Sequence, residues 1–220
     1  MTKELYENDL VFADTMNVLF FDGDPMIRAQ DLSPLDPTEE HTIFDDDFVS
    51  ITESEEKTDK TQRKAEAFSN QKYRDVLRML QTQNGKLKVR IIVGAEIQSH
   101  IHYAMPIRNF EYDALNLSRQ LSARQKYNRE NHLLKSKNEF LSGIKKGETF
   151  TPVLTVVVYL GKETWDAPKT LHEMFNLDGV PETLLAYVPD YRTAILQPES
   201  VTSKQLARMK SPLRHILGVI

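Results

Sequence analysis

Residues 72–98 read KYRDVLRMLQTQNGKLKVRIIVGAEIQ and contain two strand-like runs joined by an Asn-Gly pair. Asn84-Gly85 is the dipeptide that best suits a two-residue hairpin turn. We therefore predict antiparallel strands over residues 72–80 and 87–98. Apolar residues alternate along the second strand, so one of its faces is apolar, while the other face ends in two polar side chains. The pattern predicts a β-hairpin in which polar groups gather at one end.

The predicted hairpin register brings two carboxyl groups together. With a two-residue loop at the turn pair, Asp75 lies opposite Gly94, and Glu96 is its diagonal neighbour on the same face, about 7–8 Å away. Gln98 extends this row. Converging carboxylates in a chain without cysteine favour a hard cation, Mg²⁺ or Mn²⁺, of the kind that supports phosphate chemistry. The structural alternative is an ion pair between Asp75 and a nearby Lys or Arg, with Glu96 in solvent.

Helices and further strands are predicted on both sides of the hairpin. A β-branched apolar run at 153–160 is typical of a central strand that is buried on both faces. The other predicted elements follow from apolar periodicity and from turn residues: a helix over 9–21 ended by Asp22-Gly23-Asp24-Pro25, a long helix over 102–130, a short helix near 171–175, a strand over 191–196 and a final helix over 203–220. This mixture of helices and strands predicts an α/β fold.

Composition excludes several classes of protein. The chain has 220 residues, 40% of them hydrophobic, and no cysteine, which excludes disulfide frameworks, thiolate zinc sites, iron–sulfur clusters and cysteine nucleophiles. No apolar stretch approaches the roughly 18 residues of a membrane span. The N-terminus resembles neither a secretory signal nor a transit peptide. We expect a cytoplasmic protein with no membrane partner.

Charge is divided unevenly along the chain. Residues 1–59 hold 17 Asp and Glu against 3 Lys and Arg, whereas residues 60–220 hold 15 against 25. This asymmetry is compatible with a polyanionic partner, although scattered basic residues also serve simply to keep a surface soluble. The acidic excess is concentrated in a stretch poor in apolar residues, which predicts a mobile acidic insertion at 36–60 with a short strand over 48–52.

Four central segments match one known pattern: YRDVL at 73–77, GAEIQS at 94–99, IHYAMPIR at 101–108 and YDAL at 112–115. Further matches are FAD at 12–14 with Asn17, FLSG at 140–143, the strand at 152–159, and WDAP at 165–168 leading into LHEM at 171–174. Together they resemble the recombination-promoting nuclease/transposase family of bacteria, within the PD-(D/E)xK nuclease superfamily. The resemblance extends from about residue 9 to the last residue. Family members continue beyond the segment that 213–220 resembles, which favours a truncated member.

This resemblance implies a restriction-endonuclease-like core of αβββαβ type, a mixed sheet flanked by helices, in one domain over residues 1–220. It also implies Mg²⁺-dependent hydrolysis of DNA phosphodiester bonds, with Mn²⁺ as an alternative ion. Asp75 and Glu96 are similar to the metal-binding carboxylates of that superfamily. Gln98 takes the place usually held by a lysine, and because it is uncharged we expect it to orient water or phosphate. Asp14 is similar to an additional acid directed toward the ion; its alternative is a helix acid with no partner in the site.

Basic residues supply the remaining candidates. The following side chains suit contacts with a phosphate backbone, although a solvated helix end would carry the same residues: Arg108, Arg124, Lys126, Arg129, Lys145 and Lys146. His100 and His102 form an H-x-H pair without an evident third zinc ligand. Three alternatives stay open: a catalytically inactive nuclease-fold protein that binds DNA or a protein partner, RNA as substrate, and a homodimer whose interface no residue indicates.

Overall fold

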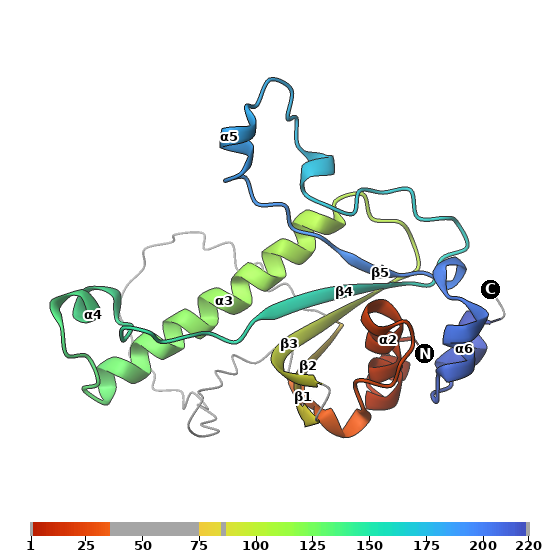
Figure 1. Cartoon of the computed structure of the whole chain (residues 1–220), viewed down its shortest axis with the longest axis horizontal. Helices are drawn as coiled ribbons and strands as arrows, with labels where there is room; N and C mark the ends of the chain where they lie inside the picture. The colour runs from red at the N-terminus through yellow and green to blue at the C-terminus, as the bar shows by residue number, and fades with distance from the viewer. Residues whose placement is uncertain (1, 36–74, 85–86, 219–220) are drawn as a thin grey trace, which may run out of the picture. The chain divides into compact units, whose positions relative to one another are not determined.

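The computed structural model describes residues 2–35, 75–84 and 87–218 (Figure 1). The chain divides into two compact units. We call Met1–Pro37, Arg74–Leu117 and Thr151–Ile220 the sheet unit, and Thr38–Tyr73 with Ser118–Phe150 the helical unit, after the helices in its described part, 118–150. The predicted acidic insertion at 36–60, with its strand over 48–52, lies outside the described residues. No helix in the described ranges is long and apolar enough to cross a membrane.

A five-stranded mixed sheet forms the centre of the sheet unit (Figure 1). Its spatial order follows the sequence: β1 (Leu32–Leu35), β2 (Val76–Asn84), β3 (Leu87–Gln98), β4 (Val153–Tyr159) and β5 (Ala194–Leu196). Strand β2 is antiparallel to both of its neighbours, whereas β3, β4 and β5 run parallel. The predicted α/β class is confirmed.

The predicted hairpin forms, but its register differs from the prediction. Asn84 pairs with Leu87, so residues 85 and 86 connect the strands, and Leu77 rather than Asp75 lies opposite Gly94. The prediction was wrong because alternation along a strand fixes the face of each side chain but not the residue that lies opposite it. A turn that moves by one residue changes the opposed pairs, but side chains that shared a face still share it. Asp75 and Glu96 therefore still belong to the same face.

Helices cover both faces of the sheet. Helix α2 (Asp9–Phe21) packs on one face, where Phe12 and Met16 join Val93 and Val156 in the main core. Helix α3 (Met105–Glu130) lies on the opposite side (Figure 1), where Met105 packs with Val157 and Tyr159. Strand β4 is buried from Thr155 to Tyr159, which confirms the prediction of a central strand.

The ends of α2 follow from local chemistry. The Asn8 side chain accepts a hydrogen bond from the Leu10 amide at the start of the helix, and Asp22 adopts a left-handed conformation at its end. The predicted helix over 9–21 is confirmed at both boundaries. Gly23 follows with a φ of +78°, which continues the reversal of the chain at small steric cost.

Two other predictions differ from the structure, and one strand was not predicted at all. No element was predicted over 29–35, where the structure has a 3₁₀ turn (Ala29–Asp31) followed by β1, because β2 supplies the hydrogen-bonding partners of that strand. The predicted final helix is two short helices, α6 (Ser203–Arg208) and α7 (Leu213–Leu217). Pro212 separates them because it has no N–H to continue a helix. The predicted strand over 191–196 is shorter, Ala194–Leu196.

The remaining elements are short. In the sheet unit they are α1 (Thr2–Tyr6), the 3₁₀ turns His172–Met174 and Pro198–Ser200, and α5 (Glu182–Leu185). In the helical unit, α4 (Lys137–Ser142) follows α3, with Ser136 and Glu139 forming a reciprocal cap at its start. Asn128 donates to Gly143 O at 3.1 Å and to Glu148 Oε2 at 2.8 Å, which holds the chain after α4 against the end of α3.

Helix α3 presents an unusual distribution of residues. Apolar side chains at the helical spacing that predicts it, among them Ile107 and Phe110, are exposed. Polar side chains face the sheet instead, where Asp113 accepts hydrogen bonds from Thr155 Oγ1 at 2.7 Å and from the Tyr191 hydroxyl at 2.6 Å. The helix is therefore attached to the sheet by buried polar contacts as well as by Met105.

Candidate metal-binding acidic site

Glu96 is the most deeply buried acidic residue of the candidate site. It is the third residue from the end of β3 and lies on the face that α3 covers. Only 1% of its surface is exposed. Arg108, from the first turn of α3, places Nη2 2.9 Å from Glu96 Oε2. An ionised carboxylate is stable in such a place only when it is paired. The Arg108 guanidinium supplies such a partner for Glu96.

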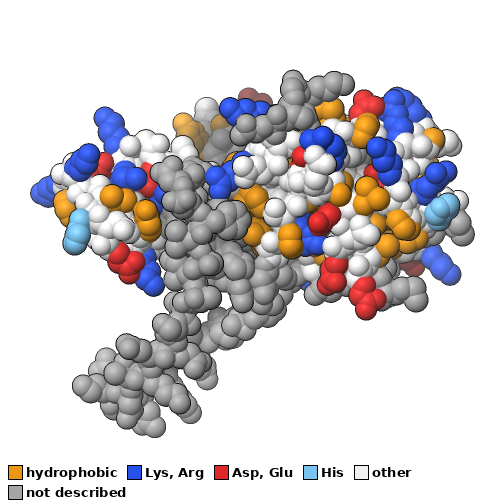
Figure 2. Space-filling model, turned by 90° about the horizontal axis from the view of Figure 1, so that it is seen from below, with side chains coloured by type: hydrophobic (Ala, Val, Ile, Leu, Met, Phe, Trp, Pro, Cys, Tyr) orange, Lys and Arg blue, Asp and Glu red, His pale blue; other side chains and the backbone are white. Residues whose placement is uncertain are grey.

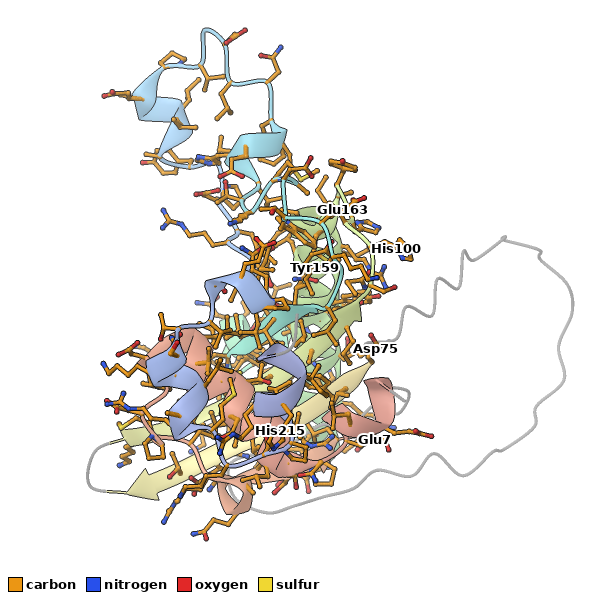
Figure 3. All side chains as sticks on the ribbon, turned by 90° about the vertical axis from the view of Figure 1, so that its right-hand side faces the viewer. Glu7, Asp75, His100, Tyr159, Glu163 and His215 are labelled. Atoms are coloured by element: carbon orange, nitrogen blue, oxygen red, sulfur yellow. The ribbon has the colours of Figure 1, made fainter. Side chains whose placement is uncertain are left out.

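Asp75 lies immediately before β2, on the neighbouring strand (Figure 3). Val76 pairs with Ala95, so continuing the register by one step places Asp75 directly opposite Glu96. Asp75 Oδ2 accepts a hydrogen bond from the Ile97 amide at 2.9 Å, which ties the carboxyl group to the end of β3. Extending the register therefore gives direct opposition where the prediction had a diagonal arrangement, and directly opposed residues are nearer to each other than diagonal ones.

Arg108 supplies the positive charge of the site. Partial burial acts to lower the pKa of its guanidinium, but Glu96, Tyr112 and Asp75 act in the opposite direction and leave the pKa raised. Arg108 Nε also donates to the Tyr112 hydroxyl at 3.1 Å, and the guanidinium carbon lies 5.6 Å from the centre of that ring. One guanidinium thus faces two carboxyl groups and is held there by the helix turn behind it.

Gln98 follows Glu96 on the same face of β3, and its backbone carbonyl accepts a hydrogen bond from the Leu160 amide at 2.8 Å. The side chain is partly exposed. The structure therefore brings three of the predicted site residues, Asp75, Glu96 and Gln98, to one end of the sheet.

Asp14 lies elsewhere. It belongs to α2, on the other face of the sheet, and its Oδ2 accepts hydrogen bonds from the amides of Lys210 and Ser211 at 2.8 and 2.7 Å. Within the described ranges, no group of three or more His, Cys, Asp or Glu residues is arranged to hold a metal ion. Asp14 thus does not join Asp75 and Glu96, and the H-x-H pair of His100 and His102 has no third ligand among the described residues.

The predicted phosphate-binding residues have different surroundings. Arg108 is paired with Glu96. Within the helical unit, Glu148 Oε1 lies 3.2 Å from Arg124 Nη1 and 3.8 Å from Lys145 Nζ. The other three, Lys126, Arg129 and Lys146, are exposed. On the face seen in Figure 2, Lys and Arg side chains are scattered among acidic and apolar ones.

Sequence reasoning missed two features of the site. It did not predict that Arg108 pairs with Glu96 or that Tyr112 supports Arg108. The signal was available for the second contact, since residues four apart on a helix are neighbours and an Arg over an aromatic ring is a favourable pair. The first contact depends on how α3 crosses the sheet, which no sequence spacing reports.

The residues present suit a hard divalent cation. Asp75 and Glu96 offer only oxygen donors, and Mg²⁺ is commonly bound by one or two carboxylates together with water and substrate phosphate. The guanidinium on Glu96 shows that the fold accommodates a positive charge beside this carboxylate. No family model matches the sequence, and no curated protein or solved structure matches it either.

Proposed function

We propose that this chain is a divalent-metal-dependent DNA endonuclease whose metal ligands are Asp75 and Glu96. The observation that carries the proposal is that Glu96, buried near the end of β3, and Asp75, just before the adjacent strand β2, both lie near the Arg108 guanidinium. Buried ionisable groups with a specific charge partner are typical of functional sites, although structural ion pairs also contain such groups.

The order of elements supports a restriction-endonuclease-like core. Apart from the 3₁₀ turn Ala29–Asp31 after α2 and the short helix α4 after α3, the chain runs through α2, β1, β2, β3, α3 and β4, which is the αβββαβ order that the family resemblance implies. Asp75 immediately precedes β2, and Glu96 and Gln98 lie among the last three residues of β3, which is the placement that the family resemblance implies for an Asp followed by Glu-x-Gln. We assign this core to the sheet unit, which contains all of these elements except residues 118–130 of α3.

Each residue of the site has a distinct chemical role in this proposal. Asp75 and Glu96 provide the oxygen ligands, and a bound Mg²⁺ would neutralise phosphate charge and activate a water molecule. Gln98 offers an amide donor and acceptor that orient water or a phosphate oxygen. Arg108 adds a fixed positive charge at the rim of the site. A third of its side chain is exposed, and a guanidinium suits a phosphate group.

A second candidate function is a catalytically inactive nuclease-fold protein that binds DNA or a protein partner. The Glu96–Arg108 ion pair favours it, because this pair neutralises the buried carboxylate without a metal ion. The presence of Gln98 in place of a lysine favours it too, since an amide brings no positive charge to the attacked phosphate.

Nicking of supercoiled plasmid separates the two candidates. The purified chain is incubated with Mg²⁺, Mn²⁺ or EDTA, beside Glu96→Gln, Asp75→Asn and the control Asp166→Asn, which changes an exposed acid outside the site. The nuclease proposal predicts metal-dependent nicking that both site variants lose and the control retains. Absence of nicking with every metal would favour the inactive protein, and nicking that persists in both site variants would refute the site. A parallel RNA substrate tests the preference for DNA.

A further inference from the structure

Asn109 occupies the interface between α3 and the sheet. It follows Arg108 directly and lies one helical turn from both Met105 and Asp113. Met105 packs against Val157 of β4, and Asp113 is hydrogen-bonded to Thr155 of the same strand. Since residues four apart share a helix face, Asn109 faces β4 between these two contacts. Val157 is the lateral neighbour of Glu96, so Asn109 faces the same side of the sheet as the Glu96 carboxylate.

The Asn109 side chain is completely buried, with 0% exposed, and neither Oδ1 nor Nδ2 has a hydrogen-bond partner among the described residues. A side-chain amide loses its hydrogen bonds to water on burial, and it destabilises the fold unless other partners replace them. A leucine of similar size would fill the same space without this cost. Packing alone therefore gives no reason for an amide here.

Asn17 shows how this fold treats a buried asparagine elsewhere. It is 4% exposed, its Nδ2 donates to Ile27 O at 2.8 Å, and its Oδ1 accepts from the Ile27 amide at 2.9 Å. Both ends of that amide are used to attach a loop. Asn109, in contrast, offers one donor group and one acceptor that no described residue uses, on the sheet face that carries the carboxylate we assign to a metal ion.

We propose that Asn109 is a positioning residue of the acidic site, and that its amide hydrogen-bonds a water molecule held by the cation on Asp75 and Glu96. This inference rests on the metal site of the proposed function. An amide suits the task because its oxygen accepts from such a water while its nitrogen remains a donor for a carboxylate oxygen, and it adds no charge. Residues that orient metal ligands from behind are typically worth about 10–100-fold in metal affinity.

Titration of the full chain with Mn²⁺ by calorimetry, without nucleic acid, tests this role. Asn109→Leu should weaken Mn²⁺ binding by about 10-fold or more, while its unfolding temperature in EDTA stays equal to that of the wild type or rises. Asn109→Asp keeps an oxygen acceptor and should retain more of the affinity. The control Asn17→Leu should lower the unfolding temperature and leave Mn²⁺ affinity unchanged, because its partners lie in another part of the fold.

The outcomes separate this inference from the function on which it rests. If the wild type binds Mn²⁺, Glu96→Gln does not, and Asn109→Leu binds as the wild type does, the positioning role is refuted and the metal site stands. Should Asn109→Leu fail to fold, Asn109→Ser serves in its place with the same expectation. A wild-type chain that takes up no Mn²⁺ would refute the metal site and the positioning role together.

Discussion

Glu96 and Arg108 form the contact on which the proposed chemistry depends. The glutamate is almost wholly buried, whereas a third of the arginine side chain is exposed. Breaking a fully buried pair by removing one partner costs about 3–5 kcal/mol, mostly because the other charge is left unpaired. In the proposed function, a divalent cation would compete with Arg108 for the same carboxylate.

Replacement of Arg108 by methionine should expose this competition. In EDTA, Arg108→Met should lower the free energy of unfolding by about 2–3 kcal/mol, less than for a fully buried pair because Arg108 is partly solvated. Mg²⁺ should then raise the unfolding temperature more than it does in the wild type. The control Arg192→Met removes an exposed partner of Asp190 and should change stability by less than about 1 kcal/mol. Equal stability of Arg108→Met and the wild type in EDTA would contradict this reading of the pair.

Asp14 gives a second test at the residue scale. Asp14→Ala removes two charge-assisted hydrogen bonds to the Lys210 and Ser211 amides, which should cost about 1–3 kcal/mol in chemical denaturation. Mn²⁺ affinity should not change, since the carboxylate is used on the other face of the sheet. The exposed Asp22 provides a comparison, because Asp22→Asn should have a smaller effect. A tenfold loss of Mn²⁺ affinity in Asp14→Ala would instead place Asp14 in the metal site, as the family resemblance implies.

At the scale of single elements, the segment around α4 depends on one carboxylate. Backbone amides of Lys146, Lys135 and Ser136 donate to Glu139 and lower its pKa to about 2 from an ordinary value of 4.5. Because the folded-state pKa is the lower one, these contacts stabilise the segment fully above pH 4.5, and that contribution is lost as the pH falls toward 2.

Amide hydrogen exchange of residues 135–146 measures this dependence. Protection should fall as the pH drops through this window, after correction for the intrinsic exchange rate. Glu139→Gln should show reduced protection already at neutral pH, with little further loss on acidification. A pH-independent protection in the wild type would show that the charge of Glu139 does not hold this turn.

Individual elements also show which parts of the fold can be predicted from the sequence. The apolar run of α2 lies between Asn8 and the Asp22-Gly23 reversal, so both ends of the helix are local and predictable. The β-branched run of β4 is equally distinctive. Strand β1 could not be predicted, because its four residues include Pro34 and become a strand only by pairing with β2.

The candidate site likewise combines features that the sequence predicts with features that it does not. The shared face of Asp75 and Glu96 follows from alternation along the strands, but their direct opposition depends on a turn whose position differs from that of Asn84-Gly85. The Arg108 contact depends on the crossing of α3 over the sheet, and the polar buried side of α3 conflicts with its apolar spacing. Non-local packing decides these features, and no local pattern encodes it.

At the scale of the whole molecule, metal binding and stability are linked. A ligand that binds only the folded chain stabilises it by about 2.7 kcal/mol at a concentration 100 times its dissociation constant. Saturating Mg²⁺ should therefore raise the unfolding temperature of the wild type in a concentration-dependent manner. Glu96→Gln should lose that response, whereas the exposed-site variant Asp166→Asn should keep it. A response of equal size in Glu96→Gln would assign the stabilising ion to another site.

Crystals grown with Mn²⁺ provide the most direct test of the central claim, that Asp75 and Glu96 form one divalent-cation site. Anomalous scattering from manganese locates the ion without reference to activity. We predict a peak between the two carboxyl groups, with Arg108 displaced from Glu96 or sharing it. Absence of a peak there at saturating Mn²⁺, with the Glu96–Arg108 pair intact, would contradict the metal site and leave the ion pair as a structural contact.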